Sequence, residues 1–370
     1  MRQRTLKRKK KIISVVLIGA ALYCFCANYN MILPAIAAGA EQTAKFSALA
    51  VMPEGGAERL REEMSGEISV TKSTMVTVPV TTPPKPTENP QVTTKTTEKT
   101  TTNPQYGKVQ TVNMSGSGYS FKWNNILVNN KTKSHTFNIE KELAIRPDIN
   151  IHKNGKPQVL IMHTHATESY MTTDNGQYNK SFSARDRDNT KNMVRVGEEI
   201  KKQLDAAGIV TIHDKTQHDY PSYNGGYERS AATTKKYLKQ YPSIDVVLDI
   251  HRDAITRDDG TKIKPTAVIG GKKAAQIMIC AGCQDDKVTG FPDWQHNLRF
   301  ALRLQKQCND SYSGLVRPMY FVSKKYNEYL SRGSLLLEMG SDSNTLEEAV
   351  YSGKLLGISL AKVLNTLEIK

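Results

Sequence analysis

Three short runs of almost uninterrupted apolar residues constrain the fold of this chain most strongly. They are Gln158–His163 (QVLIMH), Val246–His251 (VVLDIH) and Ser334–Met339 (SLLLEM). Strands that are covered on both faces have this composition, as in a parallel sheet with helices on either side. Helical patterns alternate with such runs along the chain, which is typical of an α/β protein. We therefore predict an α/β domain with a mostly parallel central sheet flanked by helices.

The same patterns predict the other elements of this domain. Further strands are expected at Ile209–His213, Thr266–Ile269 and Gln276–Cys280. Helices are expected at Asn192–Ala207, Glu228–Tyr241, Asn297–Ser311 and Leu346–Leu367. Gly208 directly follows the first of these helices, where a glycine often ends a helix.

The first 38 residues have the pattern of a membrane anchor. Residues 1–11 carry seven positive charges and no negative one, and the stretch from Ile12 to Tyr29 is uncharged and mostly apolar. By the positive-inside rule we expect a cytoplasmic tail at 1–11 and a transmembrane signal-anchor at 12–38. The rest would then be extracytoplasmic in a single-pass membrane protein. The alternative is a signal peptide that is cleaved near residues 35–40.

A linker is expected between the anchor and the folded domain. Thr71–Pro104 consists largely of Thr, Pro, Val and Lys, a composition that buries too little apolar surface to fold. We therefore predict an extracytoplasmic Thr/Pro-rich linker at 39–118 and a catalytic domain at 119–370. The net charge of +15 suits an anionic cell wall. No nucleic-acid-binding motif accompanies this charge, so a nucleic-acid partner is not expected.

Polar side chains follow the apolar runs at the point where each strand should end. His163, His165 and Glu168 come after the first run, His251 ends the second, and Glu338 lies near the end of the third. Because the carboxyl ends of parallel strands meet at one edge of a sheet, these side chains are expected to lie together. Imidazole and carboxylate are zinc ligands, and a separate carboxylate can act as general base. A lone histidine at such a position is more often a hydrogen-bonded surface residue, and Glu338 alone could be a paired structural carboxylate.

Several separated motifs resemble the sporulation stage II protein P family. They are His163–Tyr170, Asn192–Gly197, His213–Thr216, Asp219–Asn224, Ile250–Ala254 and Leu337–Gly340. The resemblance extends from Gln158 to the C-terminus, and that family is similar in fold to zinc-dependent N-acetylmuramoyl-L-alanine amidases. Their closing motif, Glu-x-Gly-x-x-Ser-Asn, is present here as Glu338–Asn344.

The resemblance implies roles for particular residues. It implies His165 and His251 as ligands of Zn²⁺ and Glu338 as the catalytic glutamate. The amidases place their third ligand near the start of the next helix, where this chain has Thr190-Lys191-Asn192 and no carboxylate. Glu168 is therefore our candidate for the third ligand. His163 has no counterpart in the amidases and is a candidate for an additional ligand, for a group that orients a ligand, or for a substrate contact.

The resemblance also implies a cellular role. It implies peptidoglycan hydrolysis by an amidase, with an endopeptidase activity also associated with the family, during septal wall degradation and forespore engulfment. The implied partners are peptidoglycan, the mother-cell membrane at the sporulation septum, and the stage II sporulation proteins D and M. The alternative is a non-catalytic wall-binding scaffold for other hydrolases.

Two further features allow more than one interpretation. Cys280 and Cys283 form a CxxC pattern, interpreted as structural cysteines or a disulfide, with a cysteine peptidase as a weaker alternative. The turn-rich loop Tyr220–Tyr227 is either an ordinary connection or an aromatic lining for a substrate groove.

Overall fold

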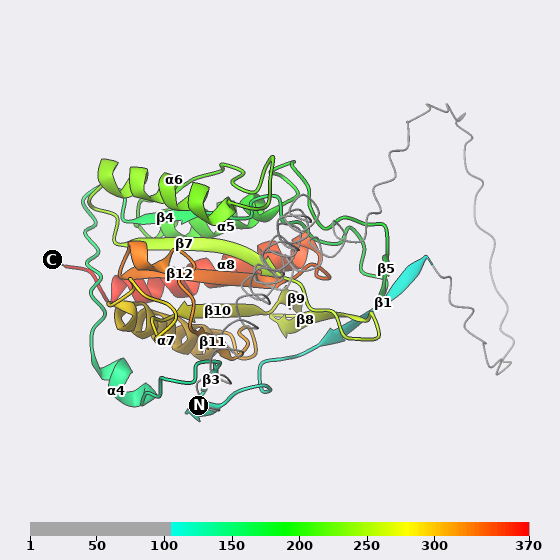
Figure 1. Cartoon of the computed structure of the whole chain (residues 1–370), viewed down its shortest axis with the longest axis horizontal. Coiled ribbons are helices and arrows are strands. Elements are labelled where there is room, and N and C mark those ends of the chain that lie inside the picture. Colours follow the sequence, from blue (N-terminus) through cyan, green and yellow to red (C-terminus); the bar gives the residue numbers. More distant parts are fainter. Residues whose placement is uncertain (1–104, 370) are drawn as a thin grey trace, which may run out of the picture. The chain divides into compact units, whose positions relative to one another are not determined.

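The structure is a computed structural model and describes residues 105–369 (Figure 1). The predicted cytoplasmic tail, the membrane anchor at 12–38 and the linker as far as residue 104 lie outside these residues. Within the described part of the chain, none of the helices combines the length and apolar character that crossing a bilayer requires.

An eight-stranded sheet forms the centre of the fold, with the strand order β2-β3-β11-β10-β12-β7-β4-β6. Its strands are β2 (Phe121–Trp123), β3 (Ile126–Asn130), β4 (Val159–Met162), β6 (Thr211–His213), β7 (Val246–Asp253), β10 (Ile277–Gly282), β11 (Met319–Val322) and β12 (Gly333–Ser341). Neighbouring strands are parallel except for the pairs β2–β3 and β10–β12. The predicted mostly parallel sheet is therefore confirmed, and its three apolar runs form the adjacent parallel strands β12, β7 and β4.

Within residues 105–369, five α-helices and one short 3₁₀ helix accompany the sheet. They are α4 (Ile139–Ala144), α5 (Met193–Ala206), α6 (Gly226–Gln240), α7 (Trp294–Ser311), α8 (Leu346–Asn365) and the 3₁₀ helix η1 (Glu328–Leu330). The main hydrophobic core joins α5, α7 and α8 to one face of the sheet. A smaller cluster, which contains Leu160, Met162 and Val247, packs against α6 on the other face. Figure 1 shows α6 beside β4.

The four predicted helices are confirmed, and their observed ends lie within three residues of the expected ones. Local chemistry explains several of these ends. Asn192 caps α5 by accepting a hydrogen bond from the backbone N–H of Val194, and Thr345 forms a capping box with Glu348 at the start of α8. Gly208, just beyond α5, has a φ of +79°.

A second, four-stranded sheet has the order β5-β1-β8-β9. Its strands are β1 (Tyr106–Val112), β5 (Gln177–Asn179), β8 (Lys262–Ile269) and β9 (Lys272–Ala275). Strand β1 lies inside the range 39–118 that the sequence assigns to the linker, so that boundary is wrong. The residues of β1 other than Val109 are exposed or half-buried, and the strand is fixed by pairing with β8, about 150 residues away, which a local pattern does not reveal.

Candidate functional site

The carboxyl ends of β4, β7 and β12 bring His165, His251 and Glu338 to one edge of the sheet. Glu338 on β12 is the register partner of His251 on the neighbouring parallel strand β7. His165 follows β4, and its ring meets the ring of His251 edge-on, with centroids 5.3 Å apart. All three side chains are buried. The convergence of these three residues, which were predicted from separate strands, is therefore observed.

Several polar atoms of this cluster are buried without a hydrogen-bond partner among residues 105–369. They are both ring nitrogens of His165 and Oε2 of Glu338. Nε2 of His251 lies 2.9 Å from Oδ1 of Asp249, although the two atoms are not aligned for a hydrogen bond. Burying such atoms unpaired costs free energy, so each unsatisfied group in a native site calls for an explanation. A ligand that binds at this edge of the sheet would provide one.

Glu168 approaches the same cluster from the loop after β4. Its Oε2 lies 3.6 Å from Nδ1 of His251 and accepts a hydrogen bond of 3.1 Å from the backbone N–H of Arg252. Its Oε1 lies 3.7 Å from Nη2 of Arg185. Glu168 therefore belongs to the centre, but a backbone donor and a guanidinium hold its carboxylate in place.

The surroundings shift the pKa values of the two histidines in opposite directions. Burial lowers the pKa of His165 well below its usual value, with the charge of His251 adding to the effect. Burial also disfavours protonation of His251, but Asp249 and then Glu168 and Glu338 outweigh it and raise that pKa to about 9. Carboxylates therefore surround His251, whereas the charges of Arg185, Arg252 and Arg229 act on His165.

Burial also raises the pKa of Glu338, to about 8. The nearby Asp253 adds to this rise, whereas His251 and Arg317 oppose it. A carboxyl group with a pKa near the working pH can both accept and return a proton, as a general base requires.

His163 is not part of this cluster. Its ring lies on the opposite face of the sheet, against α5, where Nδ1 is 2.9 Å from the carbonyl oxygen of Ile250 and Nε2 is 2.8 Å from Nε2 of His213. The fit is tight, since a Cβ atom added at Gly197 would lie 2.9 Å from His163 Nε2. Burial, and then the charge of His213, lowers the pKa of His163 to about 3. Continued alternation would put His163 and His165 on the same face, but β4 ends at Met162, so the chain turns away and His165 reaches the other face.

The predicted ligands are not preassembled. As the side chains lie, residues 105–369 contain no group of three or more His, Cys, Asp or Glu side chains that could hold a metal ion. Of the four predicted ligands, the structure brings His165, His251 and Glu168 into one neighbourhood and leaves His163 outside it.

Aromatic side chains cover the cluster. Tyr223 stacks on His165 with ring centroids 4.2 Å apart, and Tyr227 lies edge-on to His165 at 5.7 Å. The ring centroid of Tyr227 lies 6.3 Å from that of Tyr326, which precedes η1. The loop Tyr220–Tyr227 therefore lines the site. Its aromatic residues were the sequence signal for that role, whereas nothing in the sequence pointed to Tyr326.

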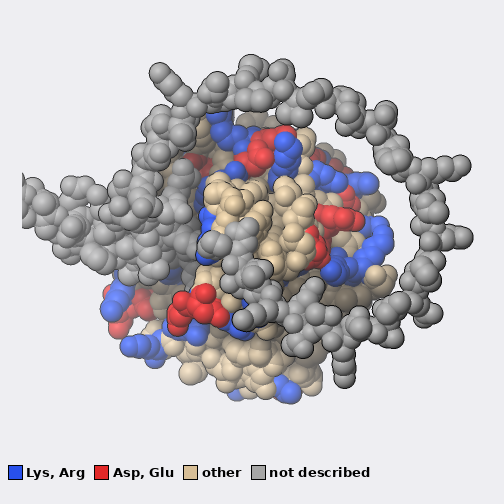
Figure 2. Space-filling view, turned by 90° about the vertical axis from the view of Figure 1, so that its right-hand side faces the viewer, with Lys and Arg blue, Asp and Glu red and all other residues tan. Residues whose placement is uncertain are grey.

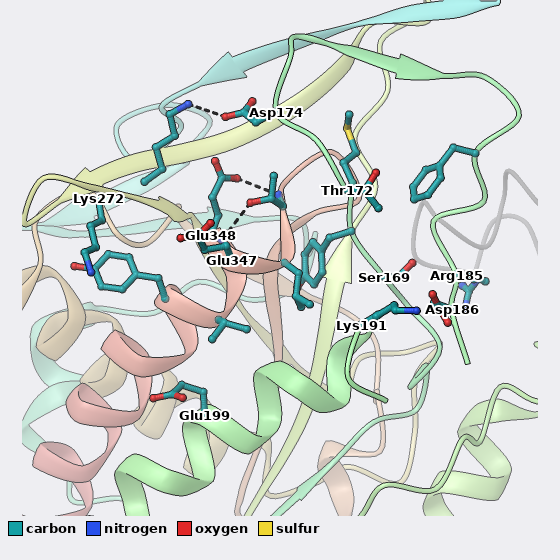
Figure 3. A pocket seen from close by; sticks show the side chains of 18 of the residues that line it. Ser169, Thr172, Asp174, Arg185, Asp186, Lys191, Glu199, Lys272, Glu347 and Glu348 are labelled. Carbon is teal, nitrogen blue, oxygen red and sulfur yellow. Dashed lines mark hydrogen bonds and ion pairs between the residues drawn. The ribbon is translucent and has the colours of Figure 1, made fainter. Parts of the chain in front are cut away.

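Arg185 lies between Tyr223 and a neighbouring cavity. Its Nη1 donates a hydrogen bond of 2.8 Å to Asp219 Oδ2, and its guanidinium lies over the ring of Tyr223. Arg185 and Ser169 also line a cavity of about 960 Å³ (Figure 3). Figure 3 shows acidic and basic side chains on both sides of this cavity, including Asp174, Asp186, Lys191, Lys272, Glu347 and Glu348. The cavity thus lies next to the residues that hold Glu168.

The turn after β12 fixes the position of Glu338. Gly340 has a φ of +77°, and a Cβ atom there would lie 2.6 Å from Oδ1 of Asn344. That oxygen accepts a hydrogen bond from the backbone N–H of Ser341, and Ser343 Oγ donates to the carbonyl oxygen of Ile263 on β8. The Gly, Ser and Asn of the Glu338–Asn344 motif therefore shape the turn and dock it on the small sheet.

The two cysteines of the CxxC pattern are free thiols. Cys280 and Cys283 are buried and are not joined to each other. Burial raises the pKa of Cys283 to about 12 and that of Cys280 well above its usual value. A nucleophilic cysteine needs its thiolate, so the structure argues against the cysteine peptidase alternative.

The surface charge of the described residues is mixed on the face that Figure 2 shows. Basic and acidic side chains are interspersed there around an area of uncharged ones. The described residues of this face therefore do not form a continuous basic surface.

The fold and the site together define a mixed α/β protein with a buried histidine–carboxylate centre at the edge of a mostly parallel sheet. The sequence profile of stage II sporulation protein P (SpoIIP) matches residues 59–363. The chain belongs to this family, as its motifs indicated. The stage II sporulation protein P of Bacillus subtilis (strain 168) is 28% identical over 204 residues, which are 52% of this chain and 47% of that protein. The match thus spans about half the length of that relative.

Solved structures of amidases resemble parts of the chain at low sequence identity. The N-acetylmuramyl-L-alanine amidase of Mycobacterium abscessus is 14% identical, with a TM-score of 0.34, over 57% of this chain and 99% of its own. The N-acetylmuramoyl-L-alanine amidase of Clostridium difficile 630 is 12% identical, with a TM-score of 0.34, over 58% of this chain and 97% of its own. An activity must therefore be argued from the residues of the site.

Proposed function

We propose that this chain is a zinc-dependent N-acetylmuramoyl-L-alanine amidase that hydrolyses peptidoglycan. One observation carries the proposal: His165 and His251 meet edge-on beside Glu168, with both ring nitrogens of His165 buried and unpartnered in the described part of the chain. Membership of a sporulation protein family adds the biological setting.

The residues present fit zinc by their chemistry. Imidazole nitrogens and a carboxylate are the donors that catalytic zinc sites use, and a buried imidazole with a lowered pKa is in the neutral form that binds a metal. His165, His251 and Glu168 would hold the ion, while His163 has both ring nitrogens engaged elsewhere. When bound, zinc supplies Lewis acidity that polarises the carbonyl group and lowers the pKa of water to about 7.

The residues of the chain supply the other requirements of amide hydrolysis. Glu338 accepts a proton from the attacking water and returns it to the leaving amine. Asp249 orients the loop after β4, because its carboxylate accepts hydrogen bonds from the backbone N–H and the hydroxyl of Thr164, at 2.8 and 2.6 Å. It also lies against the ring of His251, so one carboxylate positions both histidine-bearing segments.

A peptidoglycan strand can reach the site only after its cover moves. His165, His251 and Glu338 are each at most 5% exposed, and Tyr223 stacks directly on His165. The closed arrangement excludes water from the buried charges, and substrate binding would displace the Tyr220–Tyr227 loop.

The proposal includes a place in the cell. The uncharged segment at 12–38 would anchor the chain in the mother-cell membrane at the sporulation septum, with the catalytic domain on the extracytoplasmic side. There it would degrade septal peptidoglycan during engulfment, together with the stage II sporulation proteins D and M. An endopeptidase activity on cross-links would use the same centre.

The test is cleavage of purified peptidoglycan by the full-length chain in detergent, with and without a chelator. Labelling of newly freed amino groups identifies the broken bond, because an amidase exposes the amino group of the first alanine of the stem peptide. We expect chelator-sensitive release in the unsubstituted protein and none in Glu338→Gln. Glu142→Gln is the matched control and should remain active. The Glu142 carboxylate pairs with Arg299 on α7, away from the proposed centre. Binding to peptidoglycan without any bond cleavage would contradict the proposal and favour a wall-binding scaffold.

A further inference from the structure

Arg317 is a buried cation that the proposed hydrolysis does not use. It lies just before β11 and is only 4% exposed. Its Nη1 donates a hydrogen bond of 2.9 Å to Oδ2 of Asp253 on β7. Its Nε and Nη2 are buried and have no hydrogen-bond partner within residues 105–369. A guanidinium that is buried with donors unpaired pays a desolvation cost that its single ion pair offsets only in part.

The sheet register directs this guanidinium toward β12, the strand that carries Glu338. The backbone N–H of Arg317 donates a hydrogen bond to the carbonyl oxygen of Ile277 on β10. The backbone of Arg317 therefore lies beside β10, on the side away from β12. Asp253 lies two strands beyond β10, because the order is β10-β12-β7. The side chain that joins Arg317 to Asp253 therefore crosses toward β12, the strand that carries Glu338. Consistently, Arg317 is one of the charges that act on the Glu338 carboxyl.

The two unpaired nitrogens have a specific geometry. In a guanidinium, the N–H bonds of Nε and of Nη2 point in the same direction along one edge of the planar group. That edge forms two parallel hydrogen bonds with a carboxylate, which is the preferred two-pronged arrangement of arginine. Asp253 occupies only Nη1, so it leaves this edge available.

We infer that the Nε/Nη2 edge of Arg317 binds a carboxylate of the peptide substrate beside Glu338. Asp253 holds the guanidinium in place, and Arg317 becomes a specificity-determining residue that selects acidic stem peptides. The inference rests on the proposed function and names the chemistry of the substrate group that the same site recognises. A neutral carboxamide in place of the carboxylate would keep the shape and lose both the charge and one acceptor.

The test compares two soluble muramoyl-tripeptides that differ in one group. The α-carboxylate of the glutamate residue is free in one probe and converted to the carboxamide in the other. Binding is measured by calorimetry with full-length Glu338→Gln in detergent, which should turn the probes over too slowly to disturb the measurement. We expect the acid to bind roughly tenfold to 100-fold more tightly than the amide, because charge-assisted hydrogen bonds are lost.

Variants of Arg317 assign that difference to its side chain. Adding Arg317→Gln should reduce the preference to about twofold or less, and Arg317→Lys, which keeps the charge but loses the two-pronged edge, should give an intermediate value. Arg299→Lys is the matched control, since Arg299 makes an ion pair of 2.8 Å with Glu142 on α4 and should leave the preference unchanged.

The outcomes separate this inference from the proposed function. Equal binding of acid and amide by the protein that retains Arg317 overturns the inference, and so does a preference that survives Arg317→Gln. Peptidoglycan cleavage by the unsubstituted chain together with equal binding would overturn the inference alone. A preference that depends on Arg317 in a chain that cleaves nothing would overturn the proposed hydrolysis alone. Binding of neither probe would overturn the inference, and the cleavage test would decide the proposed hydrolysis separately.

Discussion

Glu338 and His251 are register partners on the adjacent parallel strands β12 and β7. Parallel strands side by side point corresponding residues to the same face, so the sheet fixes this pair before any ligand is present. Both side chains lie on the face that α6 and its preceding loop cover, where His165 arrives from β4. The proposed base and one proposed metal ligand thus lie on rigid strands, while Tyr223, which stacks on His165, lies on a loop.

Replacing Glu338 by Gln tests the base directly. The amide keeps the shape of the side chain but accepts no proton, so we expect the cleavage rate to fall by roughly 10²- to 10⁴-fold. The measurement is the rate of release of stem peptides from peptidoglycan. Metal content, measured by mass spectrometry on the same preparation, should stay unchanged. Full activity in this variant would remove Glu338 from the reaction.

The zinc content of variants distinguishes the histidines proposed as ligands from His163. We expect His165→Ala and His251→Ala to lose most of about one bound zinc per chain, because each removes a donor of the proposed centre. His163→Ala should keep its zinc, since the His163 ring is held by Ile250 and His213 on the other face of the sheet. Retention of zinc in His165→Ala together with its loss in His163→Ala would reverse the assignment.

Gly340→Ala tests the turn that holds Glu338. The position combines a φ of +77° with a Cβ that would lie 2.6 Å from Asn344 Oδ1 and 2.7 Å from Ala275 Cβ. We expect a loss of about 3 kcal/mol in the free energy of unfolding, measured by urea denaturation. Gly271→Ala is the matched control, because Gly271 has a φ of +76° and open space around it, so only the conformational cost of about 1 kcal/mol applies. Equal losses at the two positions would show that the contacts with Asn344 and Ala275 do not matter.

The buried carboxyl group of Glu328 should make the free energy of unfolding depend on pH. Burial raises the pKa of its carboxyl well above the usual value, although the backbone N–H groups of Gly282 and Leu336 oppose the rise. The folded state therefore keeps a proton that the unfolded chain releases above about pH 4.3, so stability is lost as the pH rises from there.

The variant Glu328→Gln should remove this dependence. Above about pH 5 the unsubstituted protein should lose up to about 1.4 kcal/mol per pH unit more than the variant, measured by urea unfolding at each pH. Glu347→Gln, at an exposed position on α8, controls for the loss of one carboxyl group. Identical slopes in the protein and in Glu328→Gln would contradict the account.

The central sheet could be predicted because its middle strands carry their own signal. Strands β4, β7 and β12 are buried on both faces, so their sequences are apolar almost throughout. Strand β1 is partly exposed, and its pairing with β5 and β8, both distant in sequence, rather than its composition defines it. The linker boundary was wrong for this reason.

Only those site residues that lie near the ends of buried strands could be predicted from the sequence. His251 and Glu338 end buried strands, and His165 follows one, so their convergence follows from the parallel sheet. The exclusion of His163 depends on where β4 stops, which the sequence does not specify. Arg317 and Tyr326 reach the site from segments whose local sequence says nothing about the distant strands they contact.

An anomalous difference map at the zinc absorption edge, from crystals of the protein grown with zinc, tests the central claim most directly. The account predicts one strong peak within bonding distance of a ring nitrogen of His165 and of His251, beside the carboxylate of Glu168. A peak elsewhere on the chain, with none between His165 and His251, would contradict it.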